Sequence, residues 1–273
     1  MKLSIITINR NNAEGLRKTI ESVVNQTYAD FEYIIIDGAS TDSSVDVIQQ
    51  FNNSTIQQFN WISEPDTGVY NAMNKGIYKA QGEYLLFLNS GDFLVDNGVL
   101  KNVFQLNYYE DILCGNCNVS DNGKVVWTAI PPENITFGTL FNQGLAHQAT
   151  FIKRQLFSDL GLYREDFKYN SDIDFWYRAI IVNGASTRKI NVLVSDYNLD
   201  GISSQEKLTE QYKAEINTIL KQSNFSKFIP DYESWNAERK EMEILYWVKS
   251  KKSLYWMVMQ LYRLAKWFVN RRK

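Results

Sequence analysis

Residues 82–92 read GEYLLFLNSGD, an apolar run of strand length that ends in a polar, glycine-containing turn. A short apolar run bounded by turn residues is typical of a strand buried on both faces, as in a parallel sheet. Three earlier apolar runs, at residues 3–8, 33–36 and 61–63, are each followed by a polar cluster of the same kind. We therefore predict four strands that each end in residues suited to ligand contact.

Helical periodicity separates these strands. Apolar side chains recur on one helical face in residues 11–25, 43–51 and 69–80. Strands that alternate with helices predict a mostly parallel, Rossmann-like α/β sheet with helices on both faces. Ligands bind such a sheet at the carboxyl ends of its strands, so the four polar clusters are expected to face one crevice.

After residue 92 the alternation of strands and helices is looser. We expect a helix at 95–106, strands at 111–119 and 124–128 joined by a turn at 121–123, a strand at 149–152, helices at 154–160 and 173–182, a strand at 189–197 and a helix at 208–222. We place a domain boundary at residues 204–205, so that a C-terminal helical extension covers 205–273.

The charge of the chain is unevenly distributed. Residues 249–273 contain eight Lys or Arg and no Asp or Glu, whereas the whole chain has 29 basic and 31 acidic residues. The rest of the chain is therefore acidic. This argues against nucleic acid as a partner, because phosphate binding needs a basic face.

The cysteines and the N-terminus bear on the compartment. Cys114 and Cys117 have no second metal-binding pair nearby, so we predict two buried thiols in a reduced compartment rather than a zinc site. The apolar run in residues 1–7 is too short for a signal peptide, and no stretch is apolar for long enough to span a membrane. We therefore expect a cytoplasmic location.

The order of these clusters resembles the family 2 glycosyltransferases with the GT-A fold, of the type that builds bacterial surface polysaccharides. The resemblance covers residues 3 to about 200 and rests on five segments: SIIT at 4–7, DGASTD at 37–42, DTGVYNAMNKG at 66–76, GEYLLFLNSGD at 82–92 and SDIDFW at 171–176. It implies a catalytic domain at 1–204, with a nucleotide-binding half at 1–92 and an acceptor half at 93–204.

The resemblance also implies which residues bind the nucleotide-sugar donor. Thr7, Asn9 and Arg10 correspond to residues that line the base pocket, and Asp37 to the acid that accepts a hydrogen bond from uracil. The remaining donor candidates are the ribose-side and phosphate-side Asp66, the phosphate-reaching Lys75, and Asn89. Alternatives from the local sequence are a turn-forming role for Asp37 and a solvated surface position for Lys75.

A divalent metal is expected beside the donor diphosphate. Family members carry a DxD-type carboxylate directly after the fourth strand, and Asp92 corresponds to its last acid, which implies Mg²⁺ or Mn²⁺. This chain departs from the family pattern at Asn89, where an acid is usual, and at Gly91. We therefore expect the donor phosphates to hold much of the metal. The alternative for Asp92 is an N-cap of the helix at 95–106.

The acceptor side needs a general base. An inverting transferase uses one carboxylate to take the proton from the attacking hydroxyl. The resemblance assigns this role to Asp172, which could otherwise be a helix N-cap. Asp174 is a candidate acceptor contact or helix-dipole partner, and the only histidine, His147, is a candidate metal, phosphate or acceptor contact or a structural residue. Residues 197–203 resemble a family loop that closes over the donor phosphates.

The C-terminal helix predicted at 249–273 is amphipathic. Leu254, Leu261 and Leu264 lie on its apolar face, Trp256 and Trp267 flank that face, and Lys and Arg lie on the other. This pattern is typical of a helix that lies on an anionic membrane surface. We therefore expect a peripheral location on the inner face of the plasma membrane. The alternative is packing on the catalytic domain or on a second copy, as in a homodimer.

We conclude from the sequence that the chain is a metal-dependent inverting glycosyltransferase. It is expected to move a sugar from a nucleotide donor, most readily a UDP-sugar, to a lipid-linked or polysaccharide acceptor in cell-surface glycan synthesis. Two other classes are retained: a non-catalytic sugar-nucleotide-binding scaffold of the same fold, and a nucleotidyltransferase.

Overall fold

A computed structural model of the chain describes residues 1–54, 59–199, 210–222 and 225–270. The chain divides into two compact units, Met1–Ile219 and Leu220–Lys273. The predicted boundary at residues 204–205 and residues 200–203 of the predicted loop lie outside the described residues.

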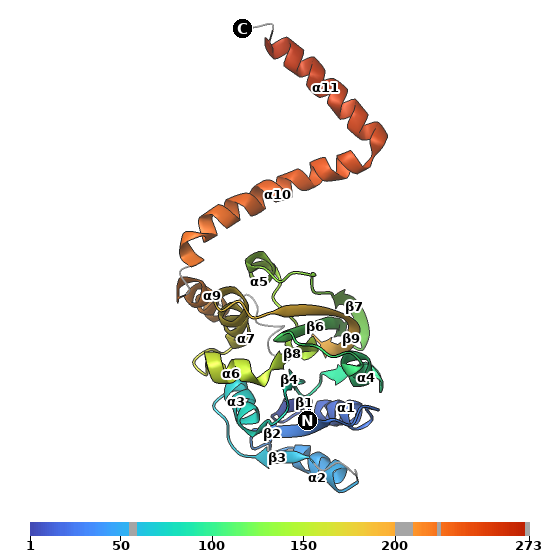
Figure 1. Cartoon of the computed structure of the whole chain (residues 1–273), viewed down its shortest axis with the longest axis vertical. Helices are drawn as coiled ribbons and strands as arrows, with labels where there is room; N and C mark the ends of the chain where they lie inside the picture. Colours follow the sequence, from blue (N-terminus) through green and yellow to red (C-terminus); the bar gives the residue numbers. More distant parts are fainter. Residues whose placement is uncertain (55–58, 200–209, 223–224, 271–273) are drawn as a thin grey trace. The chain divides into compact units, whose positions relative to one another are not determined.

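The N-terminal part of the first unit alternates strands and helices as predicted (Figure 1). The strands are β1 (Leu3–Asn9), β2 (Phe31–Asp37), β3 (Asn60–Ser63) and β4 (Tyr84–Phe87), and the helices are α1 (Ala13–Val24), α2 (Ser44–Ser54) and α3 (Val69–Lys79). β1 lies between β2 and β4, and β3 lies beside β2, all in parallel.

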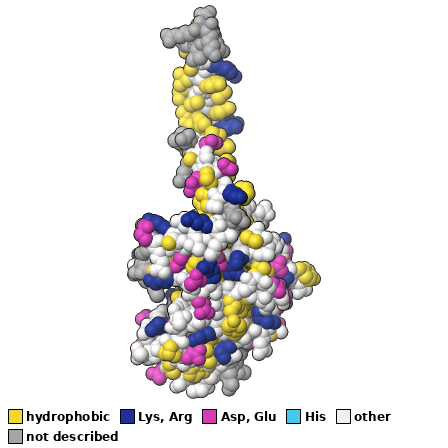
Figure 2. Space-filling view, turned by 90° about the vertical axis from the view of Figure 1, so that its left-hand side faces the viewer, with side chains coloured by type: hydrophobic (Ala, Val, Ile, Leu, Met, Phe, Trp, Pro, Cys, Tyr) yellow, Lys and Arg dark blue, Asp and Glu magenta, His cyan; other side chains and the backbone are white. Residues whose placement is uncertain are grey.

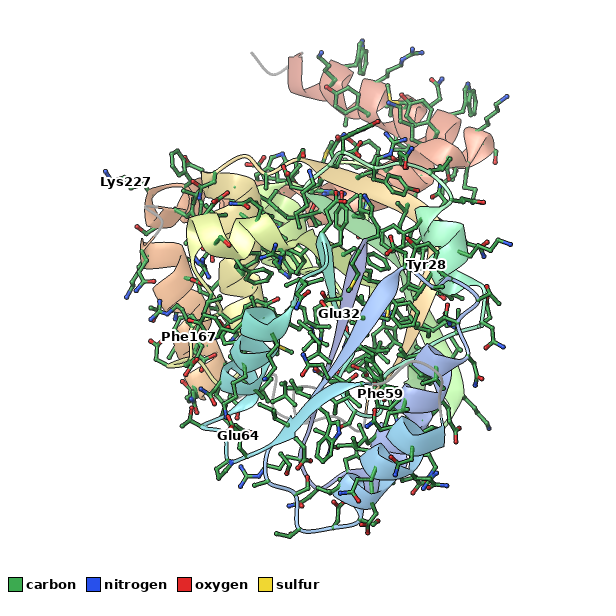
Figure 3. The ribbon with its side chains drawn as sticks, turned by 60° about the horizontal axis from the view of Figure 1, so that its bottom comes forward. Tyr28, Glu32, Phe59, Glu64, Phe167 and Lys227 are labelled. Carbon is green, nitrogen blue, oxygen red and sulfur yellow. The ribbon has the colours of Figure 1, made fainter. Side chains whose placement is uncertain are left out.

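Both faces of this parallel part are covered by helices (Figure 3). Leu3, Ile5 and Ile35 join the core cluster that includes Leu16 and Ile20 of α1. Successive strand residues point to opposite faces, and on the other face Ile6 approaches α3 so closely that a Cβ at Gly76 would collide with it. The uninterrupted apolar runs follow from this two-sided burial.

The second half adds strands β5 (Phe93–Leu94), β6 (Ile112–Asp121), β7 (Lys124–Ala129), β8 (Thr150–Lys153) and β9 (Thr187–Asn198). The sheet order is β3-β2-β1-β4-β8-β6-β9-β5, with β7 paired to β6. β8 pairs antiparallel with β4 and β6, whereas β6 and β9 are parallel. The parallel character that the sequence predicted is thus strongest before residue 92, and the complete sheet is mixed.

The helices of the second half are α4 (Val99–Phe104), α5 (Phe137–Asn142), α6 (Arg154–Leu160), α7 (Ser171–Trp176) and α9 (Glu210–Gln222). Two short helices, η1 (His147–Ala149) and the π-helical η2 (Tyr177–Val182), complete this set. Sequence periodicity missed α5, whose only local signal is the capping pair Thr136 and Thr139. The helix predicted at 95–106 begins later, at Val99, because β5 pairs with β9.

The second unit contains η3 (Phe225–Lys227), α10 (Ile229–Ser250) and α11 (Lys252–Asn270). Trp256, Leu261 and Leu264 of α11 are 66%, 64% and 60% exposed. Figure 2 shows hydrophobic side chains with Lys and Arg beside them on the visible face of the helix that leads to the C-terminus. Among the described residues, no helix is long and apolar enough to cross a membrane.

Candidate functional site

A cavity of about 1860 Å³ lies in the first unit, beside the residues that follow β1, β3 and β4. Seven of the predicted site residues line it: Asn9, Arg10, Asp66, Asn89, Asp92, His147 and Asp172. The predicted site residues that do not line it are Thr7, Asp37, Lys75 and Asp174. The rule that ligands bind at the carboxyl ends of parallel strands therefore located the cavity correctly.

The turn after β4 brings Asn89 and Asp92 into the cavity. Gly91 has a φ of 108°, a left-handed conformation that favours glycine over residues with a Cβ. Helix α1 holds this turn, because the Thr19 hydroxyl donates to the Asp92 carbonyl at 2.7 Å and accepts from the Gly91 amide at 3.0 Å. The side chains of Asn89 and Asp92 are therefore presented by a fixed backbone.

Asp92 is a buried carboxylate with a perturbed pKa. Burial raises its pKa to about 7, although nearby His147 and hydrogen bonds from Gln148 and the Asn89 turn lower it. Asp92 does not cap a helix, since α4 begins seven residues later with Gly98 as its N-cap. The N-cap alternative is therefore wrong, and a buried carboxylate facing a cavity is suited to bind a cation.

The donor atoms in this turn fit a hard divalent cation. Oδ1 of Asn89 is buried and has no hydrogen-bond partner among the described residues. Together with the Asp92 carboxylate, it offers the oxygen ligands that Mg²⁺ and Mn²⁺ prefer. The described residues contain no cluster of three or more His, Cys, Asp or Glu side chains that could hold a metal. The expectation that the donor phosphates hold much of the metal stays a prediction.

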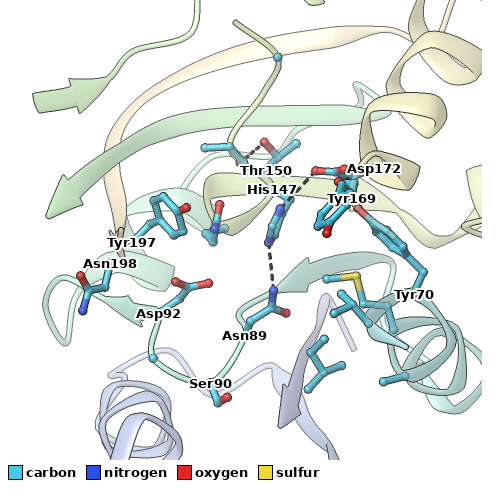
Figure 4. A pocket seen from close by; sticks show the side chains of 18 of the residues that line it. Tyr70, Asn89, Ser90, Asp92, His147, Thr150, Tyr169, Asp172, Tyr197 and Asn198 are labelled. Carbon is cyan, nitrogen blue, oxygen red and sulfur yellow. Dashed lines mark hydrogen bonds and ion pairs between the residues drawn. The ribbon is translucent and has the colours of Figure 1, made fainter. Parts of the chain in front are cut away.

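His147 lies between Asn89 and Asp172 (Figure 4). Its Nδ1 is 3.4 Å from Oδ2 of Asp172, and its Nε2 is 3.3 Å from Nδ2 of Asn89. The other carboxylate oxygen of Asp172 accepts a hydrogen bond from the Tyr70 hydroxyl at 3.0 Å. A chain of contacts thus links the turn after β4 to the proposed base, and two side chains fix the orientation of that base.

The two carboxylates near His147 act on the pKa of its imidazole. Burial lowers the pKa of His147, but the hydrogen bond and charge of Asp172 and the charge of Asp92 raise it, and the net shift is upward. The predicted metal, phosphate or acceptor contact of His147 stays a prediction, beside the alternative of a structural histidine.

Asp172 lies in the first turn of α7, and Asn170 is the N-cap of that helix. The N-cap alternative for Asp172 is therefore wrong, and its carboxylate is turned to Tyr70 and His147 instead. Asp174 is turned away from the cavity, and its carboxylate forms an ion pair with Arg178 at 2.7 Å. Its place in the first turn of α7 agrees with the alternative of a helix-dipole partner, and contact with the acceptor is not supported by this orientation.

Asp37 orients Asn9 and does not reach the cavity itself. Its carboxylate accepts hydrogen bonds from Nδ2 of Asn9 at 2.8 Å, from the Ser63 hydroxyl at 2.6 Å and from the backbone and hydroxyl of Ser40. Burial raises its pKa, but these bonds outweigh burial and lower it. In this structure neighbouring groups fill all its acceptor positions, and the predicted contact of Asp37 with uracil stays a prediction.

The hydrogen bond to Asp37 orients the side chain of Asn9. Asn9 lines the cavity, its Nδ2 is held by Asp37, and its Oδ1 is buried without a hydrogen-bond partner among the described residues. Thr7, two residues earlier in β1, is fully buried. Its hydroxyl donates to the Leu88 carbonyl at 2.7 Å and contacts the Tyr33 hydroxyl at 2.9 Å. The predicted donor contact of Thr7 is therefore corrected to a role in the core.

The loops after β1, β2 and β3 meet at Gly38. Arg10 and Asp66 are 3.9 Å apart across the cavity edge, and a Cβ at Gly38 would collide with Oδ2 of Asp66. The ammonium of Lys75 is bound to the Pro65 carbonyl at 2.8 Å and to Glu64 at 2.8 Å, outside the cavity lining. Lys75 is thus a partly buried, ion-paired lysine with a 21% exposed side chain, and its predicted contact with a phosphate stays a prediction.

Sequence reasoning missed the contribution of α9. Tyr212 lines the cavity, and Glu215 is buried against the segment that precedes α7. Tyr70, which binds Asp172, was also missed. Glu215 occupies an ordinary position of a polar helix, so no local pattern distinguishes it from a solvated residue.

Cys114 and Cys117 are free and buried as predicted, and burial raises the pKa of each thiol to about 12.

The model of the family described as Glycosyl transferase family 2 matches residues 4–160. A PGL/p-HBAD biosynthesis glycosyltransferase of Mycobacterium tuberculosis is 31% identical over 203 residues, which cover 71% of this chain and 76% of that protein. WfgD of Escherichia coli, a UDP-Glc:α-D-GlcNAc-diphosphoundecaprenol β-1,3-glucosyltransferase, is 24% identical over 219 residues, or 80% of this chain and 85% of that protein.

Two solved structures share the fold. S. aureus TarS 1–349 in complex with UDP-GlcNAc has a TM-score of 0.58 and 19% identity, covering 72% of this chain and 58% of that chain. The mannosyltransferase PcManGT of Pyrobaculum calidifontis, in complex with GDP-Man and Mn²⁺, has a TM-score of 0.54 and 16% identity, covering 72% of this chain and 56% of that chain. The family match spans both the turn that carries Asp92 and the histidine beside Asp172. The chain is a GT-A-fold glycosyltransferase and belongs to glycosyl transferase family 2.

Proposed function

We propose that this enzyme is an inverting glycosyltransferase that uses a UDP-sugar and a divalent metal to extend a lipid-linked or polysaccharide acceptor. One observation carries the proposal. The Asn89–Asp92 turn and the carboxylate of Asp172, held by Tyr70 and His147, face the same cavity. The site for a metal-bound diphosphate would therefore lie in the same cavity as the proton acceptor.

The protein groups divide between donor and acceptor. Oδ1 of Asn9, buried without a hydrogen-bond partner among the described residues, would accept a base N–H, and Arg10 and Asp66 line the same cavity. Asp92 and Oδ1 of Asn89 would hold Mg²⁺ or Mn²⁺, which neutralises the charge of the leaving diphosphate when bound. Asp172 takes the proton of the acceptor hydroxyl as that oxygen bonds to the anomeric carbon and the bond to the nucleoside diphosphate breaks.

The choice of donor and acceptor is supported by the relatives. TarS has been solved with UDP and with UDP-GlcNAc, and the name of WfgD gives a UDP-sugar donor and a diphosphoundecaprenol-linked acceptor. PcManGT carries GDP-Man, so the fold accepts a second base. A UDP donor accordingly needs a direct test.

A thermal-shift screen tests the donor with a matched pair of glycine variants. UDP-sugars with Mn²⁺ are expected to raise Tm, and GDP- and dTDP-sugars are not, because only a ligand that binds the folded state stabilises it. Gly38→Ala should abolish the shift, since the added Cβ displaces Asp66 from the base end of the cavity. Gly98→Ala, whose Cβ would meet Asp96 at 3.2 Å, is the control and should keep the shift.

The outcome separates donor class from function. A shift with a GDP-sugar alone would contradict the UDP assignment and leave glycosyl transfer intact. A wild-type shift that survives Gly38→Ala would contradict the placement of the donor between Gly38 and Asp66. A protein that binds a nucleotide-sugar but transfers no sugar to any glycan acceptor would favour the scaffold alternative.

We further propose that residues 249–273 hold the enzyme on an anionic membrane surface, on the cytoplasmic side, where a lipid-linked acceptor would lie. Trp256 and Leu261 are exposed on α11, and Arg263 and Lys266 lie on the same helix without an acidic neighbour between residues 249 and 273. Exposed apolar and basic side chains on one helix match the acyl boundary and the anionic headgroups of a bilayer. The other occupant of this face would be a second copy of the chain.

Vesicle binding tests this proposal. The full chain is expected to sediment with vesicles that contain phosphatidylserine and to bind phosphatidylcholine vesicles weakly. Replacing Arg263 and Lys266 by Gln should weaken binding by roughly 30-fold, because each basic residue near such a surface contributes about 1 kcal/mol. Lys213→Gln, in the first unit, should bind as wild type. Equal vesicle binding by all variants would contradict the membrane proposal. A stable dimer that does not sediment with the vesicles would also contradict it.

A further inference from the structure

A buried carboxylate from α9 binds the backbone that leads into the helix of Asp172. Oε1 of Glu215 accepts from the Lys168 amide at 2.8 Å, and Oε2 accepts from the amides of Tyr169 at 3.0 Å and Asn170 at 3.1 Å. Oε2 also accepts from Nδ2 of Asn170 at 3.0 Å. Three consecutive backbone N–H groups therefore converge on one side chain from a distant part of the sequence.

Loss of the Glu215 carboxylate would leave the backbone N–H groups of residues 168–170 without their acceptor and destabilise the fold. Glu215 is 6% exposed and Asn170 is fully buried, so water has little access to the carboxylate or to the Asn170 amide that it binds. Buried N–H groups without an acceptor are strongly disfavoured. Hydrogen bonds from several N–H groups to one carboxylate are charge-assisted and short-ranged, so they fix position as well as contribute stability.

The bound segment is joined to Asp172 in two ways. Asn170 is the N-cap of α7, and its carbonyl accepts from the Asp174 amide at 2.9 Å, so the first turn of the helix starts from the residue that Glu215 holds. Tyr70 donates both to the Tyr169 carbonyl at 2.8 Å and to Oδ1 of Asp172 at 3.0 Å. A shift of residues 168–170 would therefore move the Asp172 backbone and its hydrogen-bond donor together.

We infer that Glu215 is a positioning residue for transfer, and that α9 is part of the active site. The inference rests on the proposed function of Asp172 as the proton acceptor. Glu215 acts through the backbone of residues 168–170 and touches neither donor nor acceptor. The same contact places Tyr169 beside Tyr212, with ring centroids 6.4 Å apart, and both rings line the cavity. Glu215 thereby sets the acceptor side of the cavity and leaves the donor side unaffected.

Kinetics of Glu215→Gln in the full chain test this inference. A carboxamide offers one acceptor oxygen and turns an N–H₂ group toward backbone donors, so the segment should shift. We expect kcat to fall about tenfold to a hundredfold, as displacement of about 1 Å does elsewhere, while the donor KM and the donor thermal shift stay within twofold of wild type. Glu210→Gln, on the same helix with a 92% exposed side chain, is the control and should keep wild-type kcat.

A double-mutant cycle with Asp172→Asn distinguishes positioning from general destabilisation. If Glu215 acts through Asp172, Glu215→Gln should cause no further loss in the Asp172→Asn background. An equal loss in both backgrounds, or a change in donor KM without a change in kcat, would overturn the inference. If Glu215→Gln does not fold, Glu215→Asp keeps the charge on a shorter side chain and should show the same kcat-specific loss, and wild-type kcat in that variant would overturn the inference. Wild-type turnover in Asp172→Asn alone would instead contradict the proposed base.

Discussion

Replacing Asp172 by Asn is expected to lower the rate of glycosyl transfer by about 10²–10⁴-fold, the contribution typical of a general base. Asparagine keeps the size of the side chain and can still accept a hydrogen bond from Tyr70, so the fold should be retained. The amide cannot take the proton of the acceptor hydroxyl. The loss should therefore appear in kcat, measured by sugar transfer at saturating donor.

Donor binding should be unaffected by this change, because Asp172 lies across His147 from the turn of Asn89 and Asp92. The thermal shift by the donor nucleotide with Mn²⁺ should match wild type. Asp159→Asn is a suitable control, since Asp159 is exposed on α6, accepts from Gln155 at 2.7 Å and does not line the cavity. Near wild-type turnover in Asp172→Asn would remove Asp172 from the role of base.

Removal of divalent metal is expected to abolish transfer, and added Mn²⁺ should restore it to the wild-type enzyme. Asp92→Asn should be inactive under both conditions, because it lacks the one carboxylate that this turn supplies to the ion. Asp96→Asn, four residues on in an exposed position, should respond to Mn²⁺ as wild type does. Full activity in the presence of a chelator would contradict the metal role of Asp92.

The raised pKa of Asp92 adds a pH dependence with a defined sign. In the metal-free protein burial holds this pKa at about 7, against 3.8 for the ordinary carboxyl group. The folded state therefore keeps a proton that the unfolded state releases, and the stability from this group is present below about pH 4 and lost as pH rises to 7. Between these two pH values the free energy of unfolding should fall by roughly 4 kcal/mol through Asp92, at about 1.4 kcal/mol for each unit of pKa difference.

Two measurements check this sign. Unfolding without metal at pH 5 and pH 8 should show that Asp92→Asn becomes more stable relative to wild type at the higher pH, because Asn carries no charge to bury. Mn²⁺ competes with the proton for Asp92, so its affinity should rise with pH up to about 7 and then level off. Mn²⁺ affinity that is equal at pH 5 and pH 8 would show that Asp92 does not bind the ion.

The order of strands and helices before residue 92 was predictable because each strand is buried on both faces and each helix on one. These local periodicities survive in the linear sequence. The elements that were missed or shifted have weak local signals. β5 is a two-residue strand that forms only because β9 lies beside it, and α5 is six residues long.

Part of the candidate site could also be predicted from local sequence patterns. Polar residues that directly follow a buried strand must lie at one edge of the sheet, and this rule brought Asn9, Asp66, Asn89 and Asp92 to one cavity. The rule identifies which turns face the cavity and says nothing of which side chain in each turn has a free polar atom. Thr7 and Asp37 belong to the correct segments, but their polar groups are occupied by neighbours.

The sequence by itself determined the parallel core, the position of the cavity and the types of residue after each strand, because those follow from patterns within ten to twenty residues. Only the tertiary structure decided that Asp37 orients Asn9, that His147 joins Asn89 to Asp172, and that Glu215 holds the segment before α7. Each of these contacts joins residues that are far apart in the sequence. Their hydrogen-bonding capacity is therefore filled by groups that no local pattern can identify.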